Sequence, residues 1–423
     1  MDVFEEKIGG AKVFRKATTN QGTSNKEGSE LMNIYQRTKN MELSYIRTVV
    51  EKAKEMEKHG RSIVHLQIGE PDFTTPKPII EAAVEALRSG QTHYGPDEGI
   101  EELRQVVADR IKREKDLHFD PLENIIITAG ASEAIFDAIV GLSGPGQGVI
   151  ILEPAFGNYY NCCVCAGSKP LYSPLALEDN CRPDFNRLEK TINESPEVPT
   201  FLVLNNPHNP TGALFGPGDI KQLADFAQQY NLVVIADEIY EDIYYGNEKP
   251  LSIASVPGME ERTILVGGFS KTYAMTGWRL GYAAAPAPLY EPIQKIHQYA
   301  VTCAATFSQL GAAGGLKNSE DEVRRMVAEL DRRRRYLMDR LDQMEGVTYI
   351  DPEGAFYFFI NIAASGLNCL DFSRRFLEEQ GVAVIPGSTF GPSGKGFIRI
   401  SYANSLVELE KGMDRLAAFW QNL

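Results

Sequence analysis

Lys271 is the residue whose surroundings most clearly favour covalent chemistry. It lies in the segment GFSKTYAMTGWRLGY, residues 268–282, where its neighbours are apolar, glycine or hydroxylated rather than charged. A lysine amine attacks an aldehyde only when it is partly neutral, so its pKa must fall from the usual value near about 10.4. Desolvation at a strand end and the positive charge of Arg279 both favour the neutral form. The segment therefore predicts a nucleophilic lysine that binds an aldehyde, against the alternative of an ordinary surface lysine.

A second group of polar residues follows two apolar, strand-like runs. Asp237 ends the run Leu232 to Ala236, and a carboxylate at a buried strand end needs a cationic partner. The protonated nitrogen of a pyridine ring is one such partner, and a helix cap is the alternative. Tyr240 and Asn209 are placed to donate to an oxygen on the same ring, Asn209 from a turn held by two prolines and a glycine. Taken alone, Tyr240 also fits a packed aromatic residue.

Small residues between a predicted strand and a predicted helix form a candidate phosphate site at Thr128 to Ala134. The backbone amides of Ala131 and Ser132 would point at an anion from the helix N-terminus, although many strand-to-helix turns look similar. Arg279 would add charge-assisted hydrogen bonds. Phe156 either stacks on a ring face or packs in the core. A reactive lysine, a partner for a pyridinium nitrogen and a phosphate site together indicate pyridoxal 5'-phosphate, whose protonated ring withdraws electrons from a substrate carbanion.

Arg399 is the candidate receptor for a substrate carboxylate. It lies within the apolar segment FIRISY, residues 397–402, where an inward-pointing cation is costly unless it is paired. A guanidinium binds a carboxylate through two parallel hydrogen bonds, whereas a surface ion pair is the alternative. The backbone of Gly69 is placed to approach the same carboxylate, and Asn209 is assigned to the substrate as well as to the cofactor. These residues predict an enzyme that acts on amino acids.

Composition disfavours several classes of function. The chain has 423 residues, 43% of them hydrophobic and 24% charged, as in soluble proteins of two or three domains. A net charge of −14 disfavours a nucleic-acid surface, and we interpret the run Arg332 to Arg335 as a solvated helix face. No stretch approaches the roughly 20 apolar residues of a membrane helix and no signal peptide is evident, so we expect a cytoplasmic protein. The cysteines of residues 162–165 match no zinc spacing, so we expect small core residues and no metal.

The periodicity predicts a wound α/β core followed by an α+β region. Continuous apolar strands are expected over 64–68, 124–128, 149–152, 201–204 and 232–236, with helices over 79–87, 100–111, 132–142 and 220–230. Such strands are typical of a sheet covered by helices on both faces. Beyond residue 315 we expect helices over 320–344, 371–380 and at the C-terminus, with strands over 347–350, 355–360, 382–385 and 397–401.

These elements suggest four segments. Residues 1–40 lack a sustained period and form an N-terminal arm, either flexible or strapped over a partner subunit. Residues 41–75, which include a helix over 42–60, are the N-terminal part of a small domain. Residues 76–315 form the large cofactor-binding domain, and residues 316–423 complete the small one.

The motifs in this order resemble the class I and II aminotransferases, the aspartate-aminotransferase-like group of pyridoxal-phosphate enzymes. The resemblance rests on the lysine segment, NPTG at 209–212 and DEIY at 237–240, with GEPDF at 69–73 and YGP at 94–96, and it covers residues 42–423. It implies fold type I, in which helices sandwich a mostly parallel seven-stranded sheet and both chain ends build a small α+β domain. It also implies a homodimer with shared active sites.

The resemblance also assigns roles. Lys271 forms the Schiff base and moves the proton, Asp237 holds the pyridine nitrogen, and Arg399 with the Gly69 backbone holds the substrate carboxylate. The remaining cofactor contacts that it implies are Ala131, Ser132, Phe156, Asn209, Tyr240, Ser270 and Arg279, with Tyr94 from the other subunit. One position departs from the family: Gly268 stands where many relatives have a serine that donates to the phosphate, which predicts weaker cofactor retention or an altered phosphate geometry unless Ser270 compensates.

The favoured function is transamination between an L-amino acid and a 2-oxo acid. Elimination, cyclisation, oxidation or decarboxylative deamination at the same site is the alternative, and a non-catalytic regulator is a further one. No second arginine is clearly dedicated to an acidic substrate side chain, although Arg47, in the first predicted helix, could turn toward the site. We therefore favour neutral or aromatic substrates, with aspartate possible, in a pocket lined by Tyr45, Phe73, Tyr94, Cys303 and Phe307.

Overall fold

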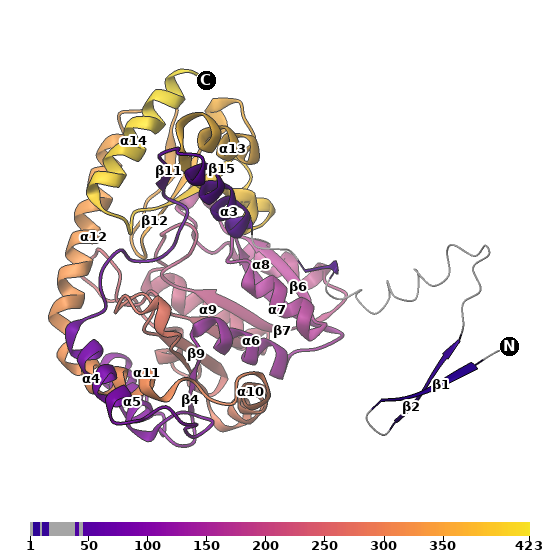
Figure 1. Cartoon of the computed structure of the whole chain (residues 1–423). Coiled ribbons are helices and arrows are strands. Elements are labelled where there is room, and N and C mark those ends of the chain that lie inside the picture. The colour runs from indigo at the N-terminus through magenta and orange to yellow at the C-terminus, as the bar shows by residue number, and fades with distance from the viewer. Residues whose placement is uncertain (1–2, 9–10, 17–38, 42–44) are drawn as a thin grey trace. The chain divides into compact units, whose positions relative to one another are not determined.

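A seven-stranded sheet lies between helices in the large part of the molecule (Figure 1). The computed structural model describes residues 3–8, 11–16, 39–41 and 45–423. The sheet has the order β4-β10-β9-β8-β7-β5-β6. Its strands are β4 (Ile125–Thr128), β5 (Gln147–Glu153), β6 (Lys169–Pro174), β7 (Val198–Asn205), β8 (Val233–Asp237), β9 (Thr263–Gly268) and β10 (Gly281–Ala284). Strand β10 runs antiparallel to β4 and β9, and the other strands of this sheet share one direction, so the sheet is mostly parallel, as predicted.

Helices lie on both sides of this sheet because its strands are apolar on both faces (Figure 1). Ile150 belongs to the core on one face and Ile151 to the core on the other. One face packs against α6 (Ala131–Leu142), α7 (Asn158–Ala166) and α10 (Ala287–Ala300). The other core includes residues of α5 (Glu101–Lys115), α9 (Pro217–Gln229) and α11 (Thr306–Gly315), while α4 (Lys77–Arg88) packs on α11 and α8 (Phe185–Glu194) lies beside β6.

A smaller antiparallel sheet, of order β11-β12-β15-β14, lies in the C-terminal part. Its strands are β11 (Thr348–Ile350), β12 (Tyr357–Asn361), β15 (Phe397–Ser401) and β14 (Ile385–Pro386), accompanied by α12 (Glu320–Leu341), α13 (Cys369–Gln380) and α14 (Leu406–Gln421). Helix α3 (Tyr45–Lys58) precedes β3 (Val64–His65), which pairs in parallel with β13 (Val382–Ala383). The segment before residue 75 therefore joins the C-terminal elements, although the predicted domain boundaries remain predictions.

Two predicted strands are shorter than expected because their backbone groups change partners. The strand over 64–68 ends at His65, after which the Leu66 carbonyl accepts from the Ser401 amide at 2.7 Å and the Gln67 carbonyl accepts from Arg399. The strand over 382–385 divides at Val384, between pairing with β3 and pairing with β15. Both changes bring this part of the chain against Arg399.

The chain divides into two compact units, Met1–Met41 and Glu42–Leu423. Within the first unit, β1 (Val3–Ile8) and β2 (Ala11–Lys16) form an antiparallel hairpin that the sequence analysis did not predict. The proposal that residues 1–40 are a flexible or dimer-strapping arm stays a prediction. Among the described residues, no helix has both the length and the apolarity to cross a bilayer, and the cytoplasmic location stays a prediction.

The prediction of a solvated face for residues 332–335 is wrong for Arg333. This side chain is 5% exposed and donates from Nη1 to Asp72 at 2.7 Å, and its guanidinium lies 4.8 Å from the centre of the Phe73 ring. A tertiary partner distant in sequence therefore buries one arginine of the run. Cys162 and Cys163 are buried, as expected of core residues.

Candidate active site

A cavity of about 330 Å³ lies at the carboxyl ends of β7 and β8 and contains Lys271; we call it the lysine cavity. Parallel sheets bind ligands at this end of their strands. The cavity brings together every predicted site residue except Tyr94, from segments far apart in sequence: Gly69, Ala131, Ser132, Phe156, Asn209, Asp237, Tyr240, Ser270, Lys271, Arg279 and Arg399. Tyr94 is 89% exposed on this chain and lies outside it.

Lys271 follows β9, and its ammonium group meets a carbonyl instead of a carboxylate. Nζ donates to the Gly69 carbonyl oxygen at 2.7 Å. Burial lowers the pKa of Lys271 to about 8, and the positive charges of Arg399 and Arg279 act in the same direction. Glu70 opposes this shift. The amine therefore has an appreciable neutral fraction near neutral pH, as a nucleophile requires.

Asp237 ends β8 as a buried carboxylate. The Tyr159 hydroxyl donates to its Oδ2 at 2.7 Å, and the Ile239 amide donates to Oδ1 at 3.3 Å. Among the described residues, no cationic side chain forms a salt bridge with Asp237. Burial therefore raises its pKa to about 6 despite those two hydrogen bonds. A bound cationic ring nitrogen would supply the missing charge.

Asn205 connects Asp237 to the turn that carries Asn209. Its Nδ2 donates to the Asp237 carbonyl at 2.9 Å, and its Oδ1 accepts from the Asn209 amide at 2.8 Å. Tyr240 lies beside this group, and its hydroxyl is 2.9 Å from that of Tyr357. The two strand ends are therefore held together by buried hydrogen bonds.

Arg399 points from β15 into the lysine cavity and is 2% exposed. It donates to the Asn209 side chain at 3.0 Å and to the Gln67 carbonyl at 2.8 Å, and its guanidinium lies 4.4 Å from the centre of the Tyr357 ring. Its Nε has no hydrogen-bond partner, and it forms no salt bridge within the described part of the chain. Burial lowers its pKa. This cation is positioned but not neutralised, which suits a carboxylate ligand.

The other end of the cavity forms a cradle for an anion. Helix α6 begins at Ala131, after Gly130 with φ 91°. A side chain at Gly281 would lie 2.4 Å from the Ala131 amide nitrogen, so this backbone approach needs a glycine. Arg279 has φ 53° and donates to the carbonyls of Thr276 and Ala129 at 2.9 and 3.1 Å. Free amides and a fixed guanidinium fit a phosphate.

Comparisons with known proteins agree with this geometry. Residues 61–416 match the sequence profile described as aminotransferase class I and II. The chain belongs to the class I and II aminotransferase family. It is 43% identical over 358 residues to the aspartate aminotransferase of Pyrococcus abyssi, covering 84% of this chain and 91% of that protein.

Two further relatives are named for aromatic amino acids instead of aspartate. The chain is 42% identical to aromatic-amino-acid aminotransferase 2 of Thermococcus litoralis over 84% of this chain and 90% of that protein. The crystal structure of an aromatic aminotransferase from Pyrococcus horikoshii matches with a TM-score of 0.82 and 41% identity, covering 88% of this chain and 99% of that one. The predicted fold type I is therefore confirmed, and so is the prediction of an aminotransferase.

The departure at Gly268 has a packing reason in this aminotransferase. A Cβ there would lie 2.9 Å from Ile239 Cδ1 and 3.1 Å from the Gly281 Cα, so a serine would need the end of the Ile239 side chain to move and the neighbouring strand to give slightly. Ser270 is buried at the cavity wall. Whether Ser270 takes over the phosphate contact stays a prediction.

Sequence analysis missed several wall residues of the aminotransferase cavity. Tyr159 and Tyr357 were missed because nothing in their local sequence distinguishes them from core aromatics. The substrate pocket was also placed wrongly for this subunit: Tyr45, Phe73, Cys303 and Phe307 do not line the cavity, and Arg47 is exposed and does not either. Instead Ile46 and Val50 of α3 line it, one and five residues further along the helix than Tyr45.

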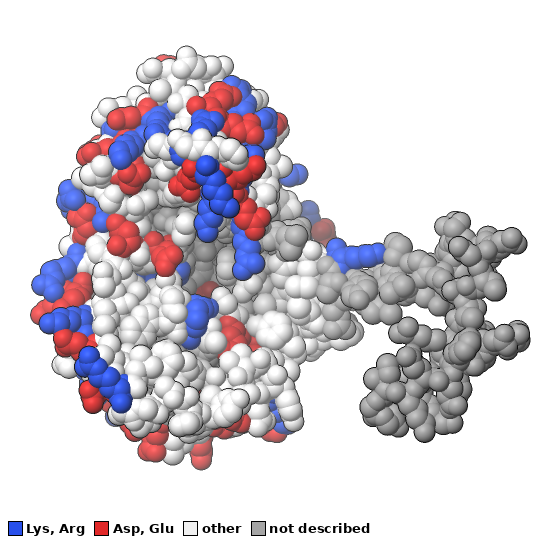
Figure 2. Space-filling view, in the orientation of Figure 1, with Lys and Arg blue, Asp and Glu red and all other residues white. Residues whose placement is uncertain are grey.

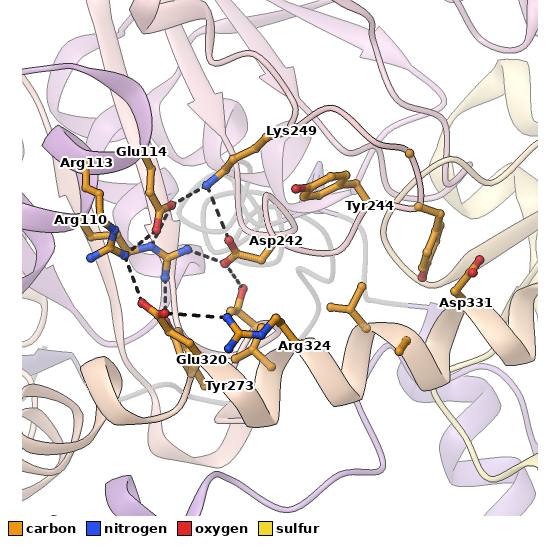
Figure 3. A pocket seen from close by; sticks show the side chains of 16 residues that line it. Arg110, Arg113, Glu114, Asp242, Tyr244, Lys249, Tyr273, Glu320, Arg324 and Asp331 are labelled. Atoms are coloured by element: carbon orange, nitrogen blue, oxygen red, sulfur yellow. Dashed lines mark hydrogen bonds and ion pairs between the residues drawn. The ribbon is translucent and has the colours of Figure 1, made fainter.

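A larger cavity, about 670 Å³, lies between α5, residues 242–249 and α12, and Figure 3 shows its side chains. We call it the ion-pair cavity. Arg110 pairs with Asp242 and, at 3.1 Å, with Glu241, and Lys249 is 2.5 Å from Glu114. Size alone would favour this cavity as the active site, but its charges neutralise one another. We therefore assign it a structural role.

Proposed function

We propose that this aminotransferase binds pyridoxal phosphate at Lys271 and transfers an amino group between an L-amino acid and a 2-oxo acid. The observation that supports this most strongly is a set of three charged groups in the lysine cavity that form no salt bridge with any described residue: the half-buried Lys271 and the buried Asp237 and Arg399. A cationic ring nitrogen and a substrate carboxylate would neutralise the second and the third.

The residues present fit the cofactor at each of its polar groups. Asp237, held by Tyr159, would pair with the ring nitrogen, and Asn209 and Tyr240 would contact the ring oxygen. The amides at Ala131 and Ser132 would hold the phosphate, together with the Ser132 hydroxyl, Ser270 and Arg279, and Phe156 would lie against the ring. When bound, pyridoxal phosphate supplies an aldehyde that links to amines and a ring that withdraws electrons from the substrate Cα.

The protein's own groups then decide which bond of the substrate breaks. Arg399 and the Gly69 backbone hold the carboxylate, which fixes the orientation of the Cα–H bond and keeps the carboxylate from leaving. Lys271 Nζ lies 2.7 Å from the Gly69 carbonyl and is therefore close to that substrate position. With a pKa of about 8 it can take and return a proton near neutral pH.

We propose neutral or aromatic amino acids as preferred donors. Ile46, Val50 and Ile68 form an apolar wall of the lysine cavity. Of the cations that line it, we assign Lys271, Arg279 and Arg399 to the cofactor and the substrate carboxylate, which leaves none in this subunit for an acidic side chain. The name of the Thermococcus litoralis relative agrees with this preference, whereas that of the Pyrococcus abyssi relative keeps aspartate as a candidate.

We further propose a homodimer in which Tyr94 enters the partner's site. Tyr94 is 89% exposed and Tyr299 is 90% exposed. Figure 2 shows a broad area with few charged side chains over α10 and α11, whereas acidic and basic side chains are interspersed elsewhere on that face. Exposed aromatic residues on such an area are typical of protein interfaces.

The experiment is a donor and acceptor screen with a mass balance. Phenylalanine, tyrosine, leucine, alanine, aspartate and glutamate are offered with 2-oxoglutarate or pyruvate, and both new 2-oxo acid and consumed acceptor are measured. We expect one acceptor consumed per product, with phenylalanine or tyrosine exceeding aspartate in kcat/KM by at least about 10-fold. Product formed without acceptor consumption would instead indicate elimination, oxidation or decarboxylative deamination.

A further inference from the structure

Three ligand-type side chains meet between α6 and α10, outside the lysine cavity. Glu133 and Asp137 lie four residues apart on α6 and therefore on one face of that helix. His297 of α10 faces them, with Nδ1 2.8 Å from Glu133 Oε1 and 3.7 Å from Asp137 Oδ2. Their ligand atoms all lie within 4.8 Å of one another. Asp137 and His297 are both 0% exposed.

Asp137 is the anomaly in this group. Neither of its carboxylate oxygens has a hydrogen-bond partner within the described part of the chain. Burial and the charge of Glu133 raise its pKa to about 8, and the nearby imidazole offsets this only in part. A buried carboxylate without a donor costs free energy unless a cation neutralises it. When both carboxyls are ionised, they lack one positive charge even if the imidazole between them is protonated.

The orientation of His297 is the one that a metal ligand needs. Its Nε2 lies 2.7 Å from the Asp97 carbonyl oxygen, which only accepts, so Nε2 carries a proton and donates. A hydrogen bond of this kind normally fixes the ring of a metal-binding histidine. Nδ1 therefore faces the two carboxylates with the electron pair that binds either a metal ion or a second proton.

The spacing also fits a small divalent ion. Zinc bonds to imidazole nitrogen and carboxylate oxygen are about 2.0–2.2 Å long, so ligand atoms of a tetrahedral site lie about 3.4 Å apart. The two separations from Nδ1, 2.8 and 3.7 Å, are on either side of this value. We propose that Glu133, Asp137 and His297 bind one divalent transition-metal ion of the zinc type.

Such an ion would act structurally, because the site is buried and separate from the reacting groups. Glu133 also accepts a hydrogen bond from the Ala129 amide, through its other carboxylate oxygen. The ion would thus tie the start of α6, which carries the candidate phosphate site, to α10. The expectation of no metal rested on the spacing of the cysteines, and these three residues were not considered. His297 lies 160 residues from Asp137, and no spacing motif joins them.

The test is zinc uptake by the full-length, cofactor-loaded protein. Protein dialysed against EDTA is given a tenfold molar excess of zinc chloride and desalted, and its metal content and thermal midpoint are measured. We expect about one zinc ion per chain and a raised midpoint. Asp137→Asn and His297→Gln should each lower zinc affinity by at least about 10-fold, since even groups that only hydrogen-bond to a ligand contribute that much.

Asp109→Asn is the control, because that carboxylate is exposed and pairs with Lys317. Asp137→Asn replaces a buried carboxyl whose oxygens lack hydrogen-bond partners by an uncharged side chain of the same size, and should therefore keep the fold. Wild-type protein that retains no zinc, or variants that bind it as tightly as wild type, would overturn the proposal and leave a shared proton as the occupant. Zinc uptake does not depend on Lys271, so a failure of the proposed function would appear separately as missing cofactor absorbance.

Discussion

The lysine cavity and the ion-pair cavity are both lined by buried charged side chains, yet they differ in how those charges are satisfied. In the ion-pair cavity Arg110 contacts Asp242, and Lys249 contacts Glu114 (Figure 3). Arg110 also pairs with Glu241, beside the cavity. In the lysine cavity the acceptors of Arg399 among the described residues are an amide oxygen and a carbonyl oxygen, both uncharged. The larger cavity is thus electrostatically complete, and the smaller one is not.

This difference carries over to the pKa values. Although burial acts against it, the charges of Arg110 and Lys249 hold the pKa of Asp242 below its usual value. Burial without a cation raises that of Asp237 to about 6. Buried charged groups whose pKa values are strongly shifted, and which lack a partner in the ligand-free protein, are typical of ligand-binding and catalytic sites. We therefore place the active site in the cavity whose charged side chains lack partners, although the other cavity is larger.

The largest effect is expected for Lys271→Ala. No other group in the lysine cavity can form the covalent link to an aldehyde, so kcat should fall by at least about 10⁴-fold. Steady-state transamination with the best donor measures this, and circular dichroism checks the fold. A variant that retains near-normal turnover would place the reactive amine elsewhere.

The two buried arginines should fail in different ways. Arg399→Ala should lower kcat/KM, with a loss of transition-state stabilisation of about 2–4 kcal/mol, because the substrate carboxylate loses its receptor. Arg110→Ala should instead lower the free energy of unfolding by about 3 kcal/mol, because Asp242 and Glu241 both lose a buried guanidinium and keep as cationic partners among the described residues only Lys249, 3.8 Å from Asp242, and Lys115, which pairs with Glu241. Both variants are measured by kinetics and by urea unfolding. Equal losses of stability at the two positions would remove the distinction between the cavities.

Replacing Asp237 or Asp242 by asparagine should change the stability of the cofactor-free protein in opposite directions. The pKa of Asp237 rises from 3.8 to about 6 on folding, so its ionisation destabilises the empty protein increasingly from pH 4 to pH 6. Asp237→Asn should therefore stabilise cofactor-free protein at pH 7 by about 2–3 kcal/mol and have little effect at pH 4. Asp242→Asn should destabilise it at pH 7. Urea unfolding at both pH values decides between these signs.

Lys249→Ala should have the smallest effect. Its ammonium group pairs with Glu114 and approaches Asp242, but its side chain is 30% exposed. Such a pair contributes about 1 kcal/mol or less, and 0.5 M salt should reduce it further. Activity should match wild type. A large loss of kcat/KM would mean that the ion-pair cavity takes part in the reaction.

Sequence alone predicted the parts of the fold with strong local patterns. The runs at 149–152, 201–204 and 232–236 are apolar throughout and became β5, β7 and β8. Strand β10 has the sequence GYAA and helix α7 has NYYNCCVCA, which show neither strand nor helix period. Their structure comes from tertiary packing, so their sequences gave no usable signal.

The residues of the candidate site likewise fall into those that the sequence predicted and those that it did not. Lys271, Asp237 and Arg399 were recognisable because a charged residue interrupts or ends an apolar run. Tyr159 was not, because only the fold brings its hydroxyl within 2.7 Å of Asp237. The pairing of Arg333 with Asp72 was missed for the same reason, since 260 residues separate the two in the chain.

The most direct test of the central claim is chemical trapping of the cofactor. Purified full-length protein is loaded with pyridoxal phosphate, reduced with borohydride, digested and analysed by peptide mass spectrometry. The account predicts a phosphopyridoxyl group on the peptide that contains Lys271, with neither Lys249 nor Lys115 modified. Modification of another lysine, or of none, would contradict it.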